Sequence, residues 1–369
     1  MTRKNANHET SLPLTISSKD GLVDQISYFN KTVASKDMSG YYLLKNGEYA
    51  YNKSYSVGHD FGSVKRLDRY DMGALSTLYI CFALKKYDSD FIKAYFDSLK
   101  WYREIYMISA EGARNHGLLN VPTDEFFDTK HYIPQDLTEQ RKIADFLIAL
   151  DRRIAAQQSL VDNLKKYKRG LLKHIFSDIS KSYRSKKLRD LVEVSGGKTP
   201  SMNNSLYWGG EIVWISSKDM KSHRIHDSEL KITGLALNEM TLYHPGTLLL
   251  VARSGILKHT LPLAILEVEA TINQDIKALQ VHGCSSVYLY YALLAKEDTI
   301  IRSHVKTGTT VQSLMMDSFL DIEIPIADIA QQKAAASKLT MIEQYVDVHE
   351  KALSVLSRMK AGFMQLLFI

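Results

Sequence analysis

The most regular hydrophobic pattern in the chain lies in residues 136–176. Apolar side chains recur there at alternating steps of four and three residues, from Ile143 to Ile175. This spacing is the a/d seam of a heptad helix, and polar side chains interrupt it at Gln157 and Lys168. The pattern predicts a long helix that packs against a partner helix.

A second copy of this pattern fills the last part of the chain. There His349 and Lys360 fall at the positions that Gln157 and Lys168 hold in the first copy, and an Ile-Pro dipeptide precedes each copy. The chain is therefore a duplication of a unit of about 190 residues. Because polar seam residues favour a single register, we expect the two helices to pair with each other, antiparallel, inside one chain.

The sequence before the first helix predicts a globular unit of mixed structure. Residues 40–55 place apolar and aromatic side chains on both sides of a Lys-Asn-Gly turn at 45–47, which predicts a β-hairpin. A strand-like run follows at 78–84. Residues 88–107 then carry apolar side chains at helical spacing behind an Asp/Ser cap. We expect an α+β unit.

Residues 188–323 repeat this plan, after a polar and basic connector at 177–188. The stretch before Gly47 is shorter than the stretch between Leu188 and the matching Gly246, so we expect the first domain to lack its opening segment. The predicted fold class is α+β, in which two globular domains alternate with two long helices that pack as an antiparallel coiled coil. The predicted domains are 1–135 (first globular domain), 136–180 (first long helix), 181–325 (second globular domain) and 326–369 (second long helix).

Composition narrows the class of protein only slightly. With a net charge of +6 and 24% charged residues, the chain has an ordinary globular composition whose mild basicity permits nucleic-acid binding. Cys81 and Cys284 are its only cysteines, which favours a reducing compartment and excludes a disulfide framework. The N-terminus has no apolar signal region, and no apolar run approaches the ~20 residues that span a bilayer. We expect a cytoplasmic protein with no membrane association.

Common catalytic motifs are absent from the sequence. It contains no phosphate-binding loop, no G-x-G-x-x-G, no G-x-S-x-G and no H-E-x-x-H. The loosest candidate is Asp219 with Glu229 and Lys231, a set of two carboxylates and a lysine that a Mg²⁺-dependent nuclease could use to hold a phosphodiester. Such spacing often arises by chance, but it leaves a self-contained nuclease open as an alternative.

The loops offer side chains suited to DNA. Arg and Lys read guanine, Asn and Gln read adenine, and Lys or hydroxyl groups in a flexible loop suit the phosphate backbone. Each cluster alone could be an ordinary surface loop, but clusters recur at matching places in the two halves. The candidate DNA-binding residues are Asn52, Lys53, Ser54, Tyr55, Arg66, Arg114, Asn115 and His116 in the first half, and Lys198, Thr199, Ser201, Ser216, Lys218, Arg253, Ser254, Lys258, Thr309 and Gln312 in the second.

With the repeat, the helices and these loops, the chain resembles the specificity subunit of type I restriction-modification systems. The run from Ile133 to Phe176, which begins "IPQDLTEQRKIADFLIALDRRI", carries the most specific part of the resemblance. The strings "PLTISSKDGLVDQISYFNK", "GEYAYNKSYS", "GARNHGLLNV", "GGKTPS" and "YWGGEIVWISSKDM" extend it over nearly the whole chain. Family members usually begin with a segment like "KKLRDLVEV", which occurs here only in the second half.

The resemblance implies a function for each part. The two globular domains would be target recognition domains, each reading one half of a split double-stranded DNA site, and the helices would set the distance between them. The chain would be a non-catalytic subunit that anchors two methyltransferase subunits and, through them, the restriction subunits. It would bind no cofactor itself, whereas S-adenosylmethionine, ATP and Mg²⁺ would act on the partner subunits.

Physical dimensions agree with this plan, and one further alternative stays open. A helix of about 42 residues spans about 60 Å, long enough to hold domains at major grooves ~34 Å or more apart.

Apolar residues beside the seam, such as Phe146, Ala149, Leu172 and Phe176, favour a second subunit on the helices or contact with the chain's own domains. A coiled-coil adaptor without DNA contact would share the helices, and its loops would be plain surface.

Overall fold

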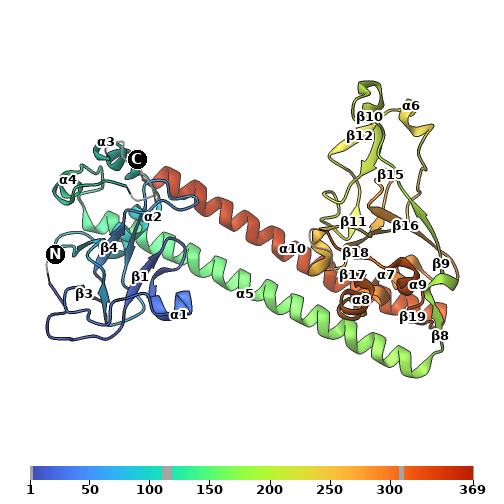
Figure 1. Ribbon diagram of the computed structural model, residues 1–369, viewed down its shortest axis with the longest axis horizontal. Coiled ribbons are helices and arrows are strands. Elements are labelled where there is room, and N and C mark those ends of the chain that lie inside the picture. Colours follow the sequence, from blue (N-terminus) through green and yellow to red (C-terminus); the bar gives the residue numbers. More distant parts are fainter. Residues whose placement is uncertain (1–2, 110–118, 307–310, 369) are drawn as a thin grey trace. The chain divides into compact units, whose positions relative to one another are not determined.

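The computed structural model describes residues 3–109, 119–306 and 311–368 (Figure 1). It separates into two compact units: unit 1 comprises Met1–Gln158 and Lys351–Ile369, and unit 2 comprises Ser159–Glu350. The two long helices are α5 (Leu137–Ser182) and α10 (Ile329–Leu367). Each long helix has one end in unit 1 and the other end in unit 2.

The described part of unit 1 holds three small antiparallel sheets beside its helices. One pairs β1 with β2, the second pairs β3 with β6, and the third has the order β5-β4-β7. The strands are β1 (Leu14–Ser17), β2 (Gly21–Asp24), β3 (Tyr42–Lys45), β4 (Tyr49–Asn52), β5 (Ser63–Arg66), β6 (Met72–Leu75) and β7 (Ile80–Phe82), and the short helices are α1 (Gln25–Phe29), α2 (Ser89–Asp97), α3 (Tyr102–Ile108) and α4 (Thr123–Asp128).

Two local predictions for unit 1 were wrong in detail. The turn at Gly47 exists, with φ +83°, but β3 and β4 on its two sides pair with different strands and form no hairpin. The chain after Gly47 moves to a second sheet, where Tyr49 and Tyr51 enter the aromatic core. The helix predicted at 88–107 is broken into α2 and α3 at Leu99, whose φ of +63° is incompatible with an α-helix.

Unit 2 is built around a five-stranded sheet with the order β11-β14-β13-β16-β9. Its strands are β8 (Ser185–Lys187), β9 (Val192–Gly196), β10 (Trp208–Ile215), β11 (Arg224–Ile225), β12 (Leu230–Ile232), β13 (Leu248–Val251), β14 (Leu263–Leu266), β15 (Ala270–Ile272), β16 (Ile276–Val281), β17 (Val305–Lys306), β18 (Ser313–Leu314) and β19 (Glu323–Pro325). Its short helices are η1 (Leu188–Asp190), η2 (Ser205–Tyr207), α6 (Gly234–Leu237), η3 (Gly255–Lys258), α7 (Ser286–Ala295), α8 (Glu297–His304) and α9 (Met316–Leu320).

The predicted connector at 177–188 is partly helical. Helix α5 continues to Ser182 because Phe176 and Ile179, 6% and 8% exposed, pack into the core of unit 2. Leu172 is buried in the same core. The apolar residues near the end of α5 are therefore covered by the chain's own domain, which was one of the two interpretations that the sequence left open.

The long helices pair antiparallel within each unit, as predicted. In unit 1 the Lys360 ammonium lies 2.5 Å from the Asp151 carboxylate, and in unit 2 Lys168 pairs with Glu343. Lys168 and Lys360 hold the same seam position in the two copies. Asp151 and Glu343 are also equivalent to each other, and they lie beside the seam. The two polar seam lysines therefore meet an acidic residue of the opposite helix, which fixes the register.

A buried glutamine joins each long helix to its globular domain in the same way. In unit 1 the Gln140 Oε1 accepts a hydrogen bond of 2.9 Å from the Asp88 amide, and its Nε2 donates to the Pro134 carbonyl. In unit 2 Gln332 bonds identically to the Ser285 amide, and its Nε2 donates to the Ala327 carbonyl. Asp88 and Ser285 are the N-caps of α2 and α7, so both junctions are built alike.

The helix register in unit 1 can be tested by crosslinking. Leu147 and Met364 line one small cavity, whereas Leu356 lies eight residues, or about 12 Å of helix rise, from Met364. We expect Leu147→Cys and Met364→Cys to crosslink within a monomer through a short bismaleimide, after Cys81 and Cys284 are replaced. The pair Leu147→Cys and Leu356→Cys is the out-of-register control. Faster crosslinking of the control, or products between molecules alone, would contradict this register.

Candidate nucleic-acid interface

The same five residues, Ile-Ser-Ser-Lys-Asp, form a turn after a strand in each unit. In unit 1 the Ser17 hydroxyl donates to the Asp20 carboxylate over 2.9 Å, and in unit 2 Ser216 donates to Asp219 over 2.7 Å. The serine and aspartate close the turn, so the lysine of the motif is left on its outside. Lys19 and Lys218 are both exposed. Lys19 was missing from the predicted residues, although the string repeated in the sequence could have revealed it.

Backbone hydrogen bonds bring several loops of unit 2 to one edge of its sheets. The Asn273 amide donates to the Ile215 carbonyl over 2.9 Å, which places the 272–275 turn beside the Ser216 turn. The Ala252 amide donates to the Asp275 carbonyl over 2.8 Å, and the Ser254 amide to the Gln312 carbonyl over 3.1 Å. We call this edge the unit 2 loop edge, formed by residues 196–199, 216–219, 252–255, 272–275 and 311–313.

The glycine loop with Lys198 joins the same edge through a close backbone approach. The Lys198 amide donates to the Ile272 carbonyl over 3.0 Å, and a Cβ on Gly197 would stand 2.0 Å from that oxygen, so only glycine fits there. Thr199 donates a hydrogen bond to the Gln274 side chain. Lys198, Thr199, Arg253 and Gln274 are all exposed. Gln274 lay in no motif, so nothing in the sequence marked it.

In unit 1 the predicted residues Asn52, Ser54 and Tyr55 line one open hollow of about 350 Å³. Ser18 lies in the same hollow, where its hydroxyl is 2.8 Å from that of Ser56. The structure thus brings the loop after β4 next to the repeated Ile-Ser-Ser-Lys-Asp turn. Lys53 is half-buried beside this hollow, and its carbonyl accepts a hydrogen bond of 2.9 Å from the Leu119 amide.

Arg66 has a different role from the one predicted. Its guanidinium donates to the Asp68 carboxylate over 2.6 Å, to Asp90 over 2.8 Å and to the Ser89 hydroxyl over 2.9 Å. Burial alone would lower the pKa of Arg66, but the hydrogen bonds that it donates to Asp90 and Asp68 raise this pKa above its ordinary value. The side chain ties β5 to the start of α2 and leaves few donors for DNA, so we remove it from the candidate interface.

The remaining predicted residues fall into three groups. Ser216 closes its turn, and the Ser254 hydroxyl accepts from the Ile256 amide, so both shape their loops. Ser201 and Lys258 are exposed, and Gln312 is half-buried. Arg114, Asn115, His116 and Thr309 lie outside the described residues.

Asp219 and Lys231, two side chains of the alternative nuclease site, contact other residues of unit 2. One Asp219 oxygen accepts from Ser216 and the other accepts from the Glu229 amide over 2.9 Å. Lys231 pairs with Asp227 at 3.2 Å. Within the described residues no group of three or more His, Cys, Asp or Glu side chains is placed to hold a metal ion. In these contacts Asp219 stabilises a loop.

Comparisons with known proteins point to one family. Residues 180–358 match the model of the type I restriction modification DNA specificity domain. This stretch is just under half of the chain, and it resembles the type I specificity family. The match includes the whole unit 2 loop edge and most of α10. No helix in the described ranges is long and apolar enough to cross a membrane.

Individual relatives support this assignment over part of their length. The chain is 36% identical to the type I restriction enzyme EcoR124I/EcoR124II specificity subunit of Escherichia coli, over 40% of this chain and 38% of the relative. It is 31% identical to the MjaIX specificity subunit of Methanocaldococcus jannaschii, over 49% of this chain and 42% of that one. The chain thus spans less than half of either relative.

The fold extends over the whole chain. A solved structure described as the structural basis of complex assembly and conformational transition of the type I restriction-modification system covers 99% of this chain, with a TM-score of 0.59 and 14% identity. This likeness confirms the predicted α+β fold with two long helices.

Proposed function

We propose that this chain is the DNA-recognition subunit of a type I restriction-modification complex and reads a bipartite double-stranded site, one half with each unit. The observation that carries the proposal is the paired turn: each unit presents its exposed lysine, Lys19 or Lys218, beside a loop rich in Arg, Asn or Ser. Equivalent loop edges in two units suit two half-sites. The lysines contact the phosphate backbone and so position the chain on the duplex, and Arg253 reads a base edge.

The catalytic steps are assigned to partner subunits in this proposal. The exposed polar side chains of the unit 2 loop edge include Lys198, Lys218, Arg253 and Gln274, and Asp219 is held inside its turn. We infer that S-adenosylmethionine binds the methyltransferase subunits, and that ATP and Mg²⁺ act on the restriction subunits. This chain supplies the sequence preference.

A stripe on α10 suits a methyltransferase subunit. Met341, Tyr345 and Val348 are 68%, 53% and 60% exposed, and their spacing places them on one face of the helix. Phe146, which the sequence singled out, is 43% exposed, and its ring packs edge-on against Phe363 with the centroids 4.9 Å apart. Exposed aromatic and apolar side chains in a row are typical of helix surfaces that bind another subunit.

The DNA-binding part of the proposal is tested by salt dependence. In the complex with a co-expressed methyltransferase subunit, Lys19→Ala and Lys218→Ala should each flatten the slope of log affinity against log salt concentration by about 0.9, because each removes one phosphate contact. Fluorescence anisotropy with duplex DNA measures this slope. Lys130→Ala, an exposed lysine away from both turns, is the control. Unchanged slopes for both turn variants would contradict the assigned surfaces.

The partner surface is tested by co-purification. Tyr345→Asp should reduce recovery of the methyltransferase subunit at least tenfold, because it places a charge in the centre of the stripe. The circular dichroism spectrum should remain that of the parent, since Tyr345 lies on the surface. Ser354→Asp, at an exposed position on another face of α10, is the matched control and should leave recovery unchanged. Full recovery with Tyr345→Asp would remove this stripe from the proposal.

A further inference from the structure

The two units differ at one edge of their matching sheets. In unit 2, β16 is flanked by β13 on one side and by β9 on the other. The matching strand of unit 1 is β7, because Tyr49 pairs with Phe82 as Leu248 pairs with Leu279. Among the strands that the structure describes, β7 pairs with β4 alone. Its other edge carries no strand in the part of unit 1 that the structure describes.

In unit 2 the segment 185–196 fills the corresponding space. Strand β8 pairs with β19 through Lys186 and Ile324, and β9 pairs with β16 through Val192 and Val281. Between these strands Leu188 and Leu191 are fully buried. They belong to one hydrophobic core with Leu279, Leu289, Phe319 and Ile324.

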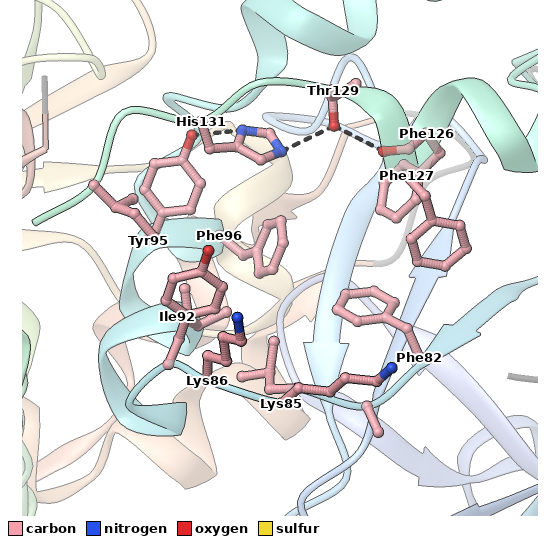
Figure 2. Close-up of a pocket in the computed structure, with 14 residues that line it drawn as sticks. Phe82, Lys85, Lys86, Ile92, Tyr95, Phe96, Phe126, Phe127, Thr129 and His131 are labelled. Carbon is pink, nitrogen blue, oxygen red and sulfur yellow. Dashed lines mark hydrogen bonds between the residues drawn. The ribbon is translucent and has the colours of Figure 1, made fainter. Parts of the chain in front are cut away.

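In unit 1 the residues at the matching positions line a cavity of about 420 Å³. Phe82, Ile92 and Ile133 stand where unit 2 has Leu279, Leu289 and Ile324. Figure 2 shows the aromatic wall that Phe82, Phe96, Phe126 and Phe127 form around this space. The volume lies in the range of protein ligand pockets, about 300–1,000 Å³.

The polar groups of this cavity lie on two sides. On one side they are hydrogen-bonded to each other, and on the other side are two lysines. His131 bonds to the Tyr95 hydroxyl and to the Thr129 hydroxyl, each over 2.9 Å, so this wall has its partners (Figure 2). Lys85 and Lys86 lie on the opposite side of the cavity in the same view. In unit 2 the matching positions are His282 and Gly283. Unit 1 therefore offers positive charge where unit 2 offers almost none.

We propose that this groove binds an extended peptide that adds a strand to the open edge of β7 and inserts two leucine-sized side chains, three residues apart, into the cavity. An acidic residue between them would meet Lys85 and Lys86. Residues 185–196 fill the equivalent groove in unit 2 and show the contacts that we expect. There the Leu188 amide donates to the Ile322 carbonyl, and the Leu191 carbonyl accepts from the His282 amide, both over 2.9 Å. Strand addition supplies backbone bonds, and the pockets select the side chains.

The test uses a fluorescein-labelled peptide with the sequence of residues 185–196, SKKLRDLVEVSG, titrated against the full chain by anisotropy. We expect saturable binding, weakened at least tenfold when both leucines of the peptide are replaced by aspartate. Hydrogen exchange should show new protection at the Ile80–Phe82 amides. Absence of binding, equal binding of both peptides or no protection at β7 would overturn the proposal.

A charge reversal distinguishes this groove from other apolar surfaces. Lys85→Glu with Lys86→Glu should weaken binding of the parent peptide and favour a peptide in which lysine replaces its aspartate. Both lysines lie at the surface end of the cavity, so this variant should fold normally. The proposal would also be overturned if the double variant bound both peptides equally well. A dimer of the chain by light scattering, lost when the peptide is added, would overturn it too, because a second copy would then occupy the groove.

Discussion

Replacing Lys168 by methionine is expected to lower the free energy of unfolding by about 3 kcal/mol, because the change leaves the Glu343 carboxylate buried without its ammonium partner. The Glu343 side chain is 4% exposed and that of Lys168 is 22% exposed. The Tyr291 hydroxyl, which donates to Glu343 over 2.8 Å, would be left as a neutral partner. Urea denaturation followed by circular dichroism measures the loss.

The duplicated sequence supplies a matched control for this prediction. Lys360→Met removes the same lysine from the other copy of the seam, but its partner Asp151 is 54% exposed and regains water. We expect that variant to lose less than about 1 kcal/mol. The double variant Lys168→Met with Glu343→Leu should recover most of the loss, since an apolar pair often replaces a buried ion pair without cost. Equal losses from Lys168→Met and Lys360→Met would contradict this account.

Arg253→Ala is expected to change base preference at one position of one half-site. Arg253 is exposed on the unit 2 loop edge, next to the β17–β18 pair through its bridge with Ser313. Loss of a bidentate arginine contact costs about 1–3 kcal/mol at the base concerned, which is a factor of about 5 to 150. Methylation of DNA variants by the complex with its methyltransferase subunit measures this change.

Lys198→Ala provides the contrast for Arg253→Ala. Lys198 sits in the Gly197 loop against the Ile272 carbonyl, where the backbone is suited to following a phosphate chain. Its loss should weaken all sequences by a similar factor without altering base preference. A variant of either residue that changed preference in both half-sites at once would end the assignment of one half-site to each unit.

The helices could be predicted from sequence because their signal is local and repeated. A seam of apolar positions specifies a long helix, and Lys168 with Lys360 marked the two places where the antiparallel partner supplies an acid. Strand pairing depends on distant residues, which is why the turn at Gly47 was found and the partners of β3 and β4 were not.

Arg66 and Lys19 show the limits of reading a binding site from residue types. Arg66 looked like a DNA contact, but Asp68 and Asp90, which approach only in the folded unit, occupy its guanidinium. Lys19 looked ordinary, although it holds the same turn position as Lys218. Comparison of the two units reveals the equivalence of Lys19 and Lys218. It also reveals the unpaired edge of β7 within the described residues, because the matching strand β16 carries β9 on that edge.

The most direct test of the central claim is the methylome of cells that express this chain with a type I methyltransferase subunit and no other modification enzyme. If each unit reads its own half-site, the methylated sites share two short specified blocks separated by a fixed number of unspecified base pairs. Arg253→Ala should relax one block and leave the other block and the spacing unchanged. A single continuous motif, or methylation that does not depend on this chain, would contradict the account.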